Sequence, residues 1–82
     1  MLTESKEHMD CKERLADITN CKKEVYITPK QRVDVACSRN IFFEVKCKKT
    51  TSGQRICNIE TIIRIGEKEY RLGEFDCTKL HS

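Results

Sequence analysis

Six cysteines constrain the fold of this chain more than any other feature of its sequence. They are spread along the 82 residues, at Cys11, Cys21, Cys37, Cys47, Cys57 and Cys77. An even number of well-separated cysteines in so short a chain is typical of an exported domain held by disulfides. We therefore expect a secreted, extracellular protein with three disulfide bonds.

The composition explains why such a chain needs covalent links. Only 38% of the residues are hydrophobic, a figure that includes the cysteines, and 35% are charged. A core of this kind supplies about 3–5 kcal/mol of stability. Disulfides contribute about 2–4 kcal/mol each by restricting the unfolded chain. The reduced chain is predicted to be marginally stable or unfolded.

The main alternative use of cysteine is a metal site, and the spacing argues against one. Structural zinc sites take pairs of ligands two to four residues apart. Here the cysteines are separated by nine, fifteen, nine, nine and nineteen residues. His8 and Cys11 share a helical face, but two ligands do not close a site. The sequence also has no Gly-rich loop and no G-x-S-x-G motif, so we expect neither a metal nor a cofactor.

Nothing in the sequence divides the chain or places it in a membrane. No apolar segment reaches the 18 or so residues that a membrane span requires. Residues 1–7 lack the apolar core of an export signal, so we expect a mature chain. One proline and three glycines leave no linker and no repeat. We expect a single secreted, disulfide-rich domain over residues 1–82.

Hydrophobic periodicity predicts one helix followed by strands. Residues 4–18 read as a helix, with acidic residues early, basic residues later, and Cys11, Leu15 and Ile18 on one buried stripe. The period then changes from 3.6 to 2, which predicts half-buried strands. Their inward residues are Val25 and Ile27, then Val33, Val35 and Cys37, then Ile41, Phe43, Val45 and Cys47.

Two turns organise the C-terminal half. Gly53 fits the left-handed position of a hairpin loop, and pairing outward from it sets Cys47 opposite Cys57, close enough for a direct bond. A second turn over 66–69 would pair Ile65 with Tyr70 and Ile63 with Leu72. The result is an antiparallel meander of three strands, 41–48, 55–65 and 69–76. The expected fold class is α+β, with the N-terminal helix packed on this small meander; six cysteines still allow fifteen pairings.

The order of the cysteines and their neighbours resembles the pancreatic-type ribonuclease superfamily, especially its shorter amphibian members. The matching features are a helix-borne Cys11, Cys21 followed by Lys22, the strands ending in Cys37 and Cys47, nine residues to Cys57, and Cys77 near the end. The resemblance implies bonds between Cys11 and Cys47, Cys21 and Cys57, and Cys37 and Cys77.

The resemblance also implies a catalytic site. Family members use two histidines as general base and general acid, and a lysine that stabilises the charge on the phosphorane. The residues that match in kind and order are His8, Lys22 and His81. The residues around them differ from the family's motifs, so no catalytic residue is favoured.

Basic and aromatic side chains provide the candidate binding surface. Lys46, Lys48, Lys49 and Arg55 gather on the hairpin around Gly53, and the formal net charge is +3. Tyr26 and Phe42 fall on the polar side of alternating strands. Exposed aromatic residues beside Lys and Arg are typical of interface hot spots.

Small disulfide-held folds generally act by presenting a rigid surface, since preorganisation lowers the entropy cost of binding. The sequence therefore favours a non-enzymatic secreted binder, whether toxin, inhibitor, ligand or host-directed effector. Its expected partner is an extracellular protein or receptor, with an anionic glycan or RNA as alternatives and no membrane span. The second hypothesis is a secreted ribonuclease of the pancreatic type, or an inactive descendant of that fold.

Overall fold

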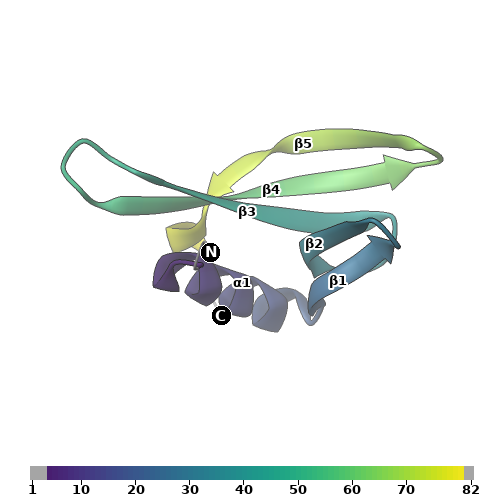
Figure 1. Ribbon diagram of the computed structural model, residues 1–82, viewed down its shortest axis with the longest axis horizontal. Coiled ribbons are helices and arrows are strands. Elements are labelled where there is room, and N and C mark those ends of the chain that lie inside the picture. The colour runs from purple at the N-terminus through teal and green to yellow at the C-terminus, as the bar shows by residue number, and fades with distance from the viewer. Residues whose placement is uncertain (1–3, 81–82) are drawn as a thin grey trace.

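A computed structural model of the chain describes residues 4–80 (Figure 1). One helix, α1 (Lys6–Thr19), precedes five strands and a short 3-10 helix. The strands are β1 (Lys22–Thr28), β2 (Gln31–Ala36), β3 (Ile41–Lys49), β4 (Arg55–Ile65) and β5 (Lys68–Asp76), and η1 is Cys77–Lys79. The strands form one antiparallel sheet in the order β1-β2-β3-β4-β5. The predicted α+β fold is confirmed, with five strands in the meander because β1 and β2 join its edge.

Local chemistry sets both ends of α1. The side chain of Ser5 accepts a hydrogen bond from the His8 N–H and caps the first turn. Asn20 ends the helix in the left-handed conformation, with φ of 58°, and donates its N–H to the Ala16 carbonyl. The buried face includes Cys11 and Leu15, as predicted, but Ile18 is 36% exposed. The helix thus packs mainly through its middle turns.

Two apolar clusters hold the sheet. The first lies between α1 and the sheet and contains Leu15, Val35, Val45 and Ile59 together with Cys11, Cys57 and Cys77. The second contains Ile27, Val33, Ala36, Phe42 and Ile62. Figure 1 shows α1 on one side of the sheet beside the β1–β2 hairpin, with the β3–β4 and β4–β5 turns at opposite ends of the molecule.

The two C-terminal turns differ in how well the sequence predicted them. Gly53 has a φ of 85°, and Cys47 pairs with Cys57, as expected from the hairpin. The predicted register of β4 and β5 was wrong, because Ile63 pairs with Tyr70 and Ile65 pairs with Lys68. The turn there holds only two residues, and a register shift between Glu60 and Ile62 faces Gly73, whose φ is 116°.

Three disulfides join the elements. Cys47–Cys57 links β3 to β4 directly, Cys21–Cys37 closes the β1–β2 hairpin, and Cys11–Cys77 ties α1 to the segment after β5. The pairing that the ribonuclease resemblance implied shares no bond with this one, so that implication was wrong. Cys37 is exposed instead of inward-facing, because it lies one residue beyond the end of β2.

Within residues 4–80, no helix combines the length and the apolar character needed to cross a membrane.

Candidate functional site

The residues that match the ribonuclease site are not gathered by the described part of the chain. His8 is half-buried on α1, and its Nε2 lies 2.8 Å from the carbonyl oxygen of Val45. Lys22 is exposed at the start of β1, where it pairs with Ala36. The side-chain contacts of His8 within residues 4–80 are with Glu4, Asp34 and Val45, not with Lys22. His81 lies outside the described residues.

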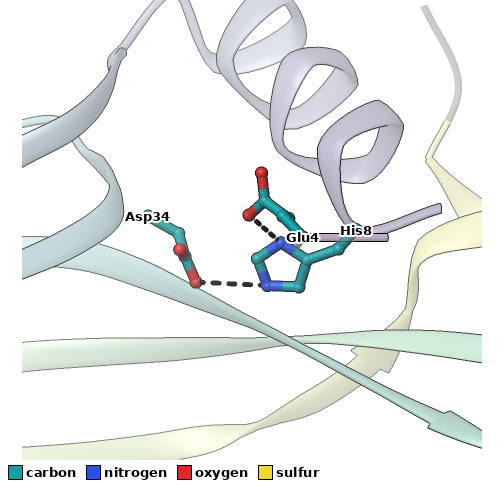
Figure 2. A group of neighbouring side chains, drawn as sticks. All are labelled: Glu4, His8 and Asp34. Carbon is teal, nitrogen blue, oxygen red and sulfur yellow. Dashed lines mark ion pairs between the residues drawn. The ribbon is translucent and has the colours of Figure 1, made fainter. Parts of the chain in front are cut away.

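His8 connects the helix to the sheet through a polar cluster (Figure 2). Its Nδ1, which is buried, forms an ion pair with the carboxylate of Glu4. On the other side of the ring, Nε2 lies 3.9 Å from Oδ2 of Asp34, next to the Val45 carbonyl. Both ring nitrogens thus face oxygen atoms, that of Glu4 on one side and those of Val45 and Asp34 on the other.

Glu4, His8 and Asp34 each place one possible metal-ligand atom within 4.8 Å of the other two, which is close enough for a candidate metal site. Figure 2 shows the two carboxylates at opposite nitrogens of the ring. Asp34 Oδ2 already accepts a hydrogen bond of 2.8 Å from the Val45 N–H. Glu4 Oε2 lies 2.6 Å from Nζ of Lys12. These contacts therefore fit a network of ion pairs and hydrogen bonds between α1 and the sheet better than they fit a cation site.

Lys12 extends this network of polar contacts to β1. Its Nζ lies 3.2 Å from Oε1 of Glu24 as well as beside Glu4. Burial alone would lower the pKa of Lys12, but its hydrogen bonds to Glu4 and Glu24 and their charges outweigh burial and hold the pKa above its ordinary value. For Glu4, burial would raise the pKa, yet Lys12 and His8 hold it below its ordinary value. The cluster is a stabilising network.

The basic hairpin is exposed, as predicted, but half of its charge is compensated. Lys46 forms an ion pair of 3.4 Å with Glu60, and Arg55 forms one of 3.6 Å with Glu7. Lys48 and Lys49 are exposed and have no ion-pair partner among residues 4–80. The hairpin therefore presents two uncompensated lysines, which is a weak anionic-partner site.

The two aromatic residues predicted to be exposed differ in their burial. Phe42 is 0% exposed, so its assignment to a binding surface was wrong. Its side chain packs in the second core cluster with Ile27, Val33, Ala36 and Ile62. Tyr26 is 62% exposed, which confirms its predicted exposure.

Tyr26 lines an open cleft of about 520 Å³, which we call the Tyr26 cleft. The β1–β2 hairpin forms one wall, the β2–β3 turn a second, and the end of β4 a third. The lining residues are Tyr26, Ile27, Thr28, Pro29, Arg39, Asn40 and Arg64. None of them is acidic, and neither arginine forms an ion pair within the described chain. The cleft thus combines an exposed aromatic ring with two uncompensated guanidinium groups.

Sequence reasoning identified Tyr26 but missed both arginines. Arg39 and Arg64 are 25 positions apart in the sequence, and each looks like an isolated surface cation. The signal that could have found Arg39 is its place in the short polar turn between β2 and β3. Only the sheet order brings that turn beside the end of β4.

A second exposed surface lies near the β4–β5 turn. Ile41, Ile63 and Tyr70 pair across β3, β4 and β5, and Ile41 and Tyr70 are 43% and 46% exposed. Ile65 and Leu72 are more exposed still. By strand alternation, Ile41 and Ile63 share the α1-bearing side of the sheet with Val45 and Ile59, but the first core cluster does not extend to them. Because this apolar group also contains an exposed tyrosine, Tyr70, it serves as a control surface for the Tyr26 cleft.

Comparison with known proteins finds no family model, curated protein or solved structure that matches this chain.

Proposed function

We propose that this protein is a secreted, non-enzymatic binder that recognises an extracellular protein through the Tyr26 cleft. The observation that carries the proposal is the composition of the cleft, where a tyrosine that is 62% exposed lies beside two arginines that have no acidic partner among residues 4–80. Tyrosine and arginine are the residues most often found at interface hot spots.

The framework around the cleft supports this function. Three disulfides cross-link the fold, and Cys21–Cys37 joins the two ends of the β1–β2 hairpin that carries Tyr26. A surface held in its bound shape loses little conformational entropy on association. Disulfides of this number in a small domain also favour an oxidising, extracellular setting.

The contacts of His8 support a role without catalysis. Both ring nitrogens are occupied by contacts with Glu4 and Val45, so neither is free to exchange a proton with a substrate. A ribonuclease role for His8, Lys22 and His81 is the competing hypothesis, and it is tested separately. The oxidised protein is incubated with single-stranded RNA beside a His8→Ala variant, and we expect no cleavage by either.

The binding proposal is tested by probing the oxidised, biotinylated protein against an array of extracellular protein domains. Tyr26→Ala is compared with Tyr70→Ala, which removes the other exposed tyrosine. We expect saturable binding that Tyr26→Ala weakens about tenfold or more, as for a hot-spot residue. Tyr70→Ala should leave the dissociation constant within about threefold of that of the unsubstituted protein, because single contacts at the rim of an interface contribute little.

Three results would overturn the proposal. One is the absence of saturable binding to any domain at micromolar protein. Another is a larger loss for Tyr70→Ala than for Tyr26→Ala, which would move the interface to the β4–β5 end. The third is RNA cleavage that disappears in the His8→Ala variant.

A further inference from the structure

The Tyr26 cleft has a positive field that nothing within it neutralises. Arg39 and Arg64 line it, and Arg32 pairs with Tyr26 on the neighbouring strand. The closest acidic position in the strand register is Glu69, opposite Arg64. Its carboxylate accepts a hydrogen bond of 3.0 Å from the side chain of Gln31, and it does not line the cleft. The cleft therefore attracts an anion.

Arg39 is held on a stiff turn. The hydroxyl oxygen of Ser38 accepts hydrogen bonds of 3.1 Å from the N–H groups of Asn40 and Ile41. The N–H groups of Cys37 and Ser38 both donate to the Ile41 carbonyl, at 3.0 and 3.2 Å. The turn also follows directly on the Cys21–Cys37 disulfide. The backbone that presents Arg39 is thus fixed from both sides.

The same turn is clamped to β4 at Arg64. The Arg64 N–H donates to the Asn40 carbonyl at 2.7 Å, and the Asn40 side-chain amide donates to the Arg64 carbonyl at 2.9 Å. Nε of Arg64 donates to the Gly66 carbonyl at 3.3 Å. This contact orients the guanidinium and leaves its two terminal nitrogens available. Two arginines from distant segments are therefore preorganised around one opening.

The chemistry of the lining selects the ligand. Guanidinium groups bind carboxylates, phosphates and sulfates through paired, charge-assisted hydrogen bonds. The opposite wall is apolar, formed by the Tyr26 ring with Ile27 and Pro29. A volume of about 520 Å³ is much larger than a carboxylate needs and has room for an aromatic ring that carries the anion.

Resting on the function proposed above, we propose that the Tyr26 cleft binds an esterified tyrosine of the partner protein, with its sulfate or phosphate group on Arg39 and Arg64. The aromatic ring of that tyrosine packs on Tyr26, with Ile27 and Pro29 at its edge. Sulfate and phosphate esters share the tetrahedral oxyanion that the two arginines recognise.

The test is an NMR titration of the oxidised, ¹⁵N-labelled protein with capped pentapeptides. Each peptide has one central residue between pairs of glycines, and that residue is O-sulfotyrosine, O-phosphotyrosine, tyrosine or glutamate. We expect saturating amide shifts over 26–29, 39–40 and 64, and affinity for an esterified peptide about tenfold above that for the tyrosine peptide. The ratio of the affinities for the sulfotyrosine and phosphotyrosine peptides identifies which ester the cleft prefers.

Variants that remove positive charge, either from the cleft or from the basic hairpin, locate the site. Arg39→Gln and Arg64→Gln should each weaken binding of the esterified peptide about fivefold or more, because each removes a charge-assisted hydrogen bond. The double variant Lys48→Gln, Lys49→Gln removes two uncompensated charges from the other end of β3 and should change affinity less than about twofold. Amide spectra of all variants verify the fold.

Three results would overturn this assignment. The tyrosine peptide or the glutamate peptide could bind as tightly as the esterified peptides. The double change of Lys48 and Lys49 could also weaken binding of the esterified peptide as much as a change of Arg39 or Arg64 does. Tighter binding of a heparin tetrasaccharide at the same amides would instead assign the cleft to a glycan. If the peptides fail while Tyr26→Ala still weakens binding to a protein domain, the ligand chemistry is wrong and the binding function stands.

Discussion

Lys12 of α1 and Glu24 of β1 form an ion pair of 3.2 Å between elements, although Lys12 is only 5% exposed. The lysine stem is buried beside the sheet while its ammonium group reaches two carboxylates at the surface, those of Glu4 and Glu24. Such a side chain stabilises a small protein in two ways, through the apolar contacts of its stem and through its charge.

Substitution of Lys12 separates these two contributions. Lys12→Ala should lower the free energy of unfolding by about 2 kcal/mol, because it removes the buried stem. Lys12→Met keeps the stem and should cost less than about 1 kcal/mol, since both carboxylates are exposed enough to be solvated again. Urea denaturation measures both values. Equal losses for the two variants would show that the charge, and not the stem, supplies the stability.

The ionic network predicts how stability depends on pH. The pKa of Glu4 is below its ordinary value of 4.5 in the folded protein, so its contribution is complete above that pH and is lost as the pH falls through the folded value. The pKa of Lys12 is above its ordinary value of 10.5, so its contribution is complete below 10.5 and is lost as the pH rises through the folded value.

Glu4→Gln should therefore flatten the acid limb of unfolding free energy against pH, and it should also weaken the alkaline limb, because Glu4 is one of the two carboxylates that raise the pKa of Lys12. A residual acid slope is expected from Asp76, whose pKa is lowered by hydrogen bonds from the backbone and hydroxyl of Thr78. Asp76→Asn in the same background should remove that remainder. An unchanged acid limb in both variants would contradict the assigned network.

The disulfides should contribute unequally. Cys11–Cys77 spans 66 residues and Cys47–Cys57 spans 10. Restriction of the unfolded chain predicts about 4 kcal/mol for the longer loop and about 3 kcal/mol for the shorter one. Replacing each pair by serine and measuring chemical denaturation checks the order. A larger loss from the 47–57 pair would show that native-state contacts, rather than loop closure, dominate.

How well the sequence predicted each element depended on the range of the interactions involved. The strand and helix ranges follow from local periodicity and caps, so 55–65 was predicted without error. Cys47 opposite Cys57 followed from one glycine turn. The β4–β5 register failed because the turn holds two residues, 66 and 67, instead of the predicted four, and the shift at Gly73 lies farther along the strands.

Phe42 should behave as a core residue and Tyr26 as a surface residue. Phe42→Ala should cost about 3–5 kcal/mol, because it empties a fully buried site. Tyr26→Ala should change the free energy of unfolding by less than about 1 kcal/mol, since most of its side chain is in solvent. Thermal or urea unfolding of both variants provides the comparison. A small loss for Phe42→Ala would mean that the second core cluster is absent in solution.

The candidate site was harder to predict than the fold, and Phe42 and Arg39 show why. Strand alternation put Phe42 among the polar positions, but it could not show that Phe42 packs with Ile27 and Val33 of the β1–β2 hairpin. Arg39 and Arg64 meet only through the order of the sheet and the backbone clamp at Asn40. Local patterns carry neither fact, because both depend on contacts between distant segments.

Titration of the ¹⁵N-labelled, oxidised protein with sodium sulfate tests most directly whether the Tyr26 cleft is the anion-binding surface. The Nε–H resonances of Arg39 and Arg64 should shift together and saturate with a single dissociation constant, and Arg39→Gln should abolish the saturation at Arg64. Shifts that never saturate, or that centre on Lys48 and Lys49 of the basic hairpin, would contradict the assignment of the cleft.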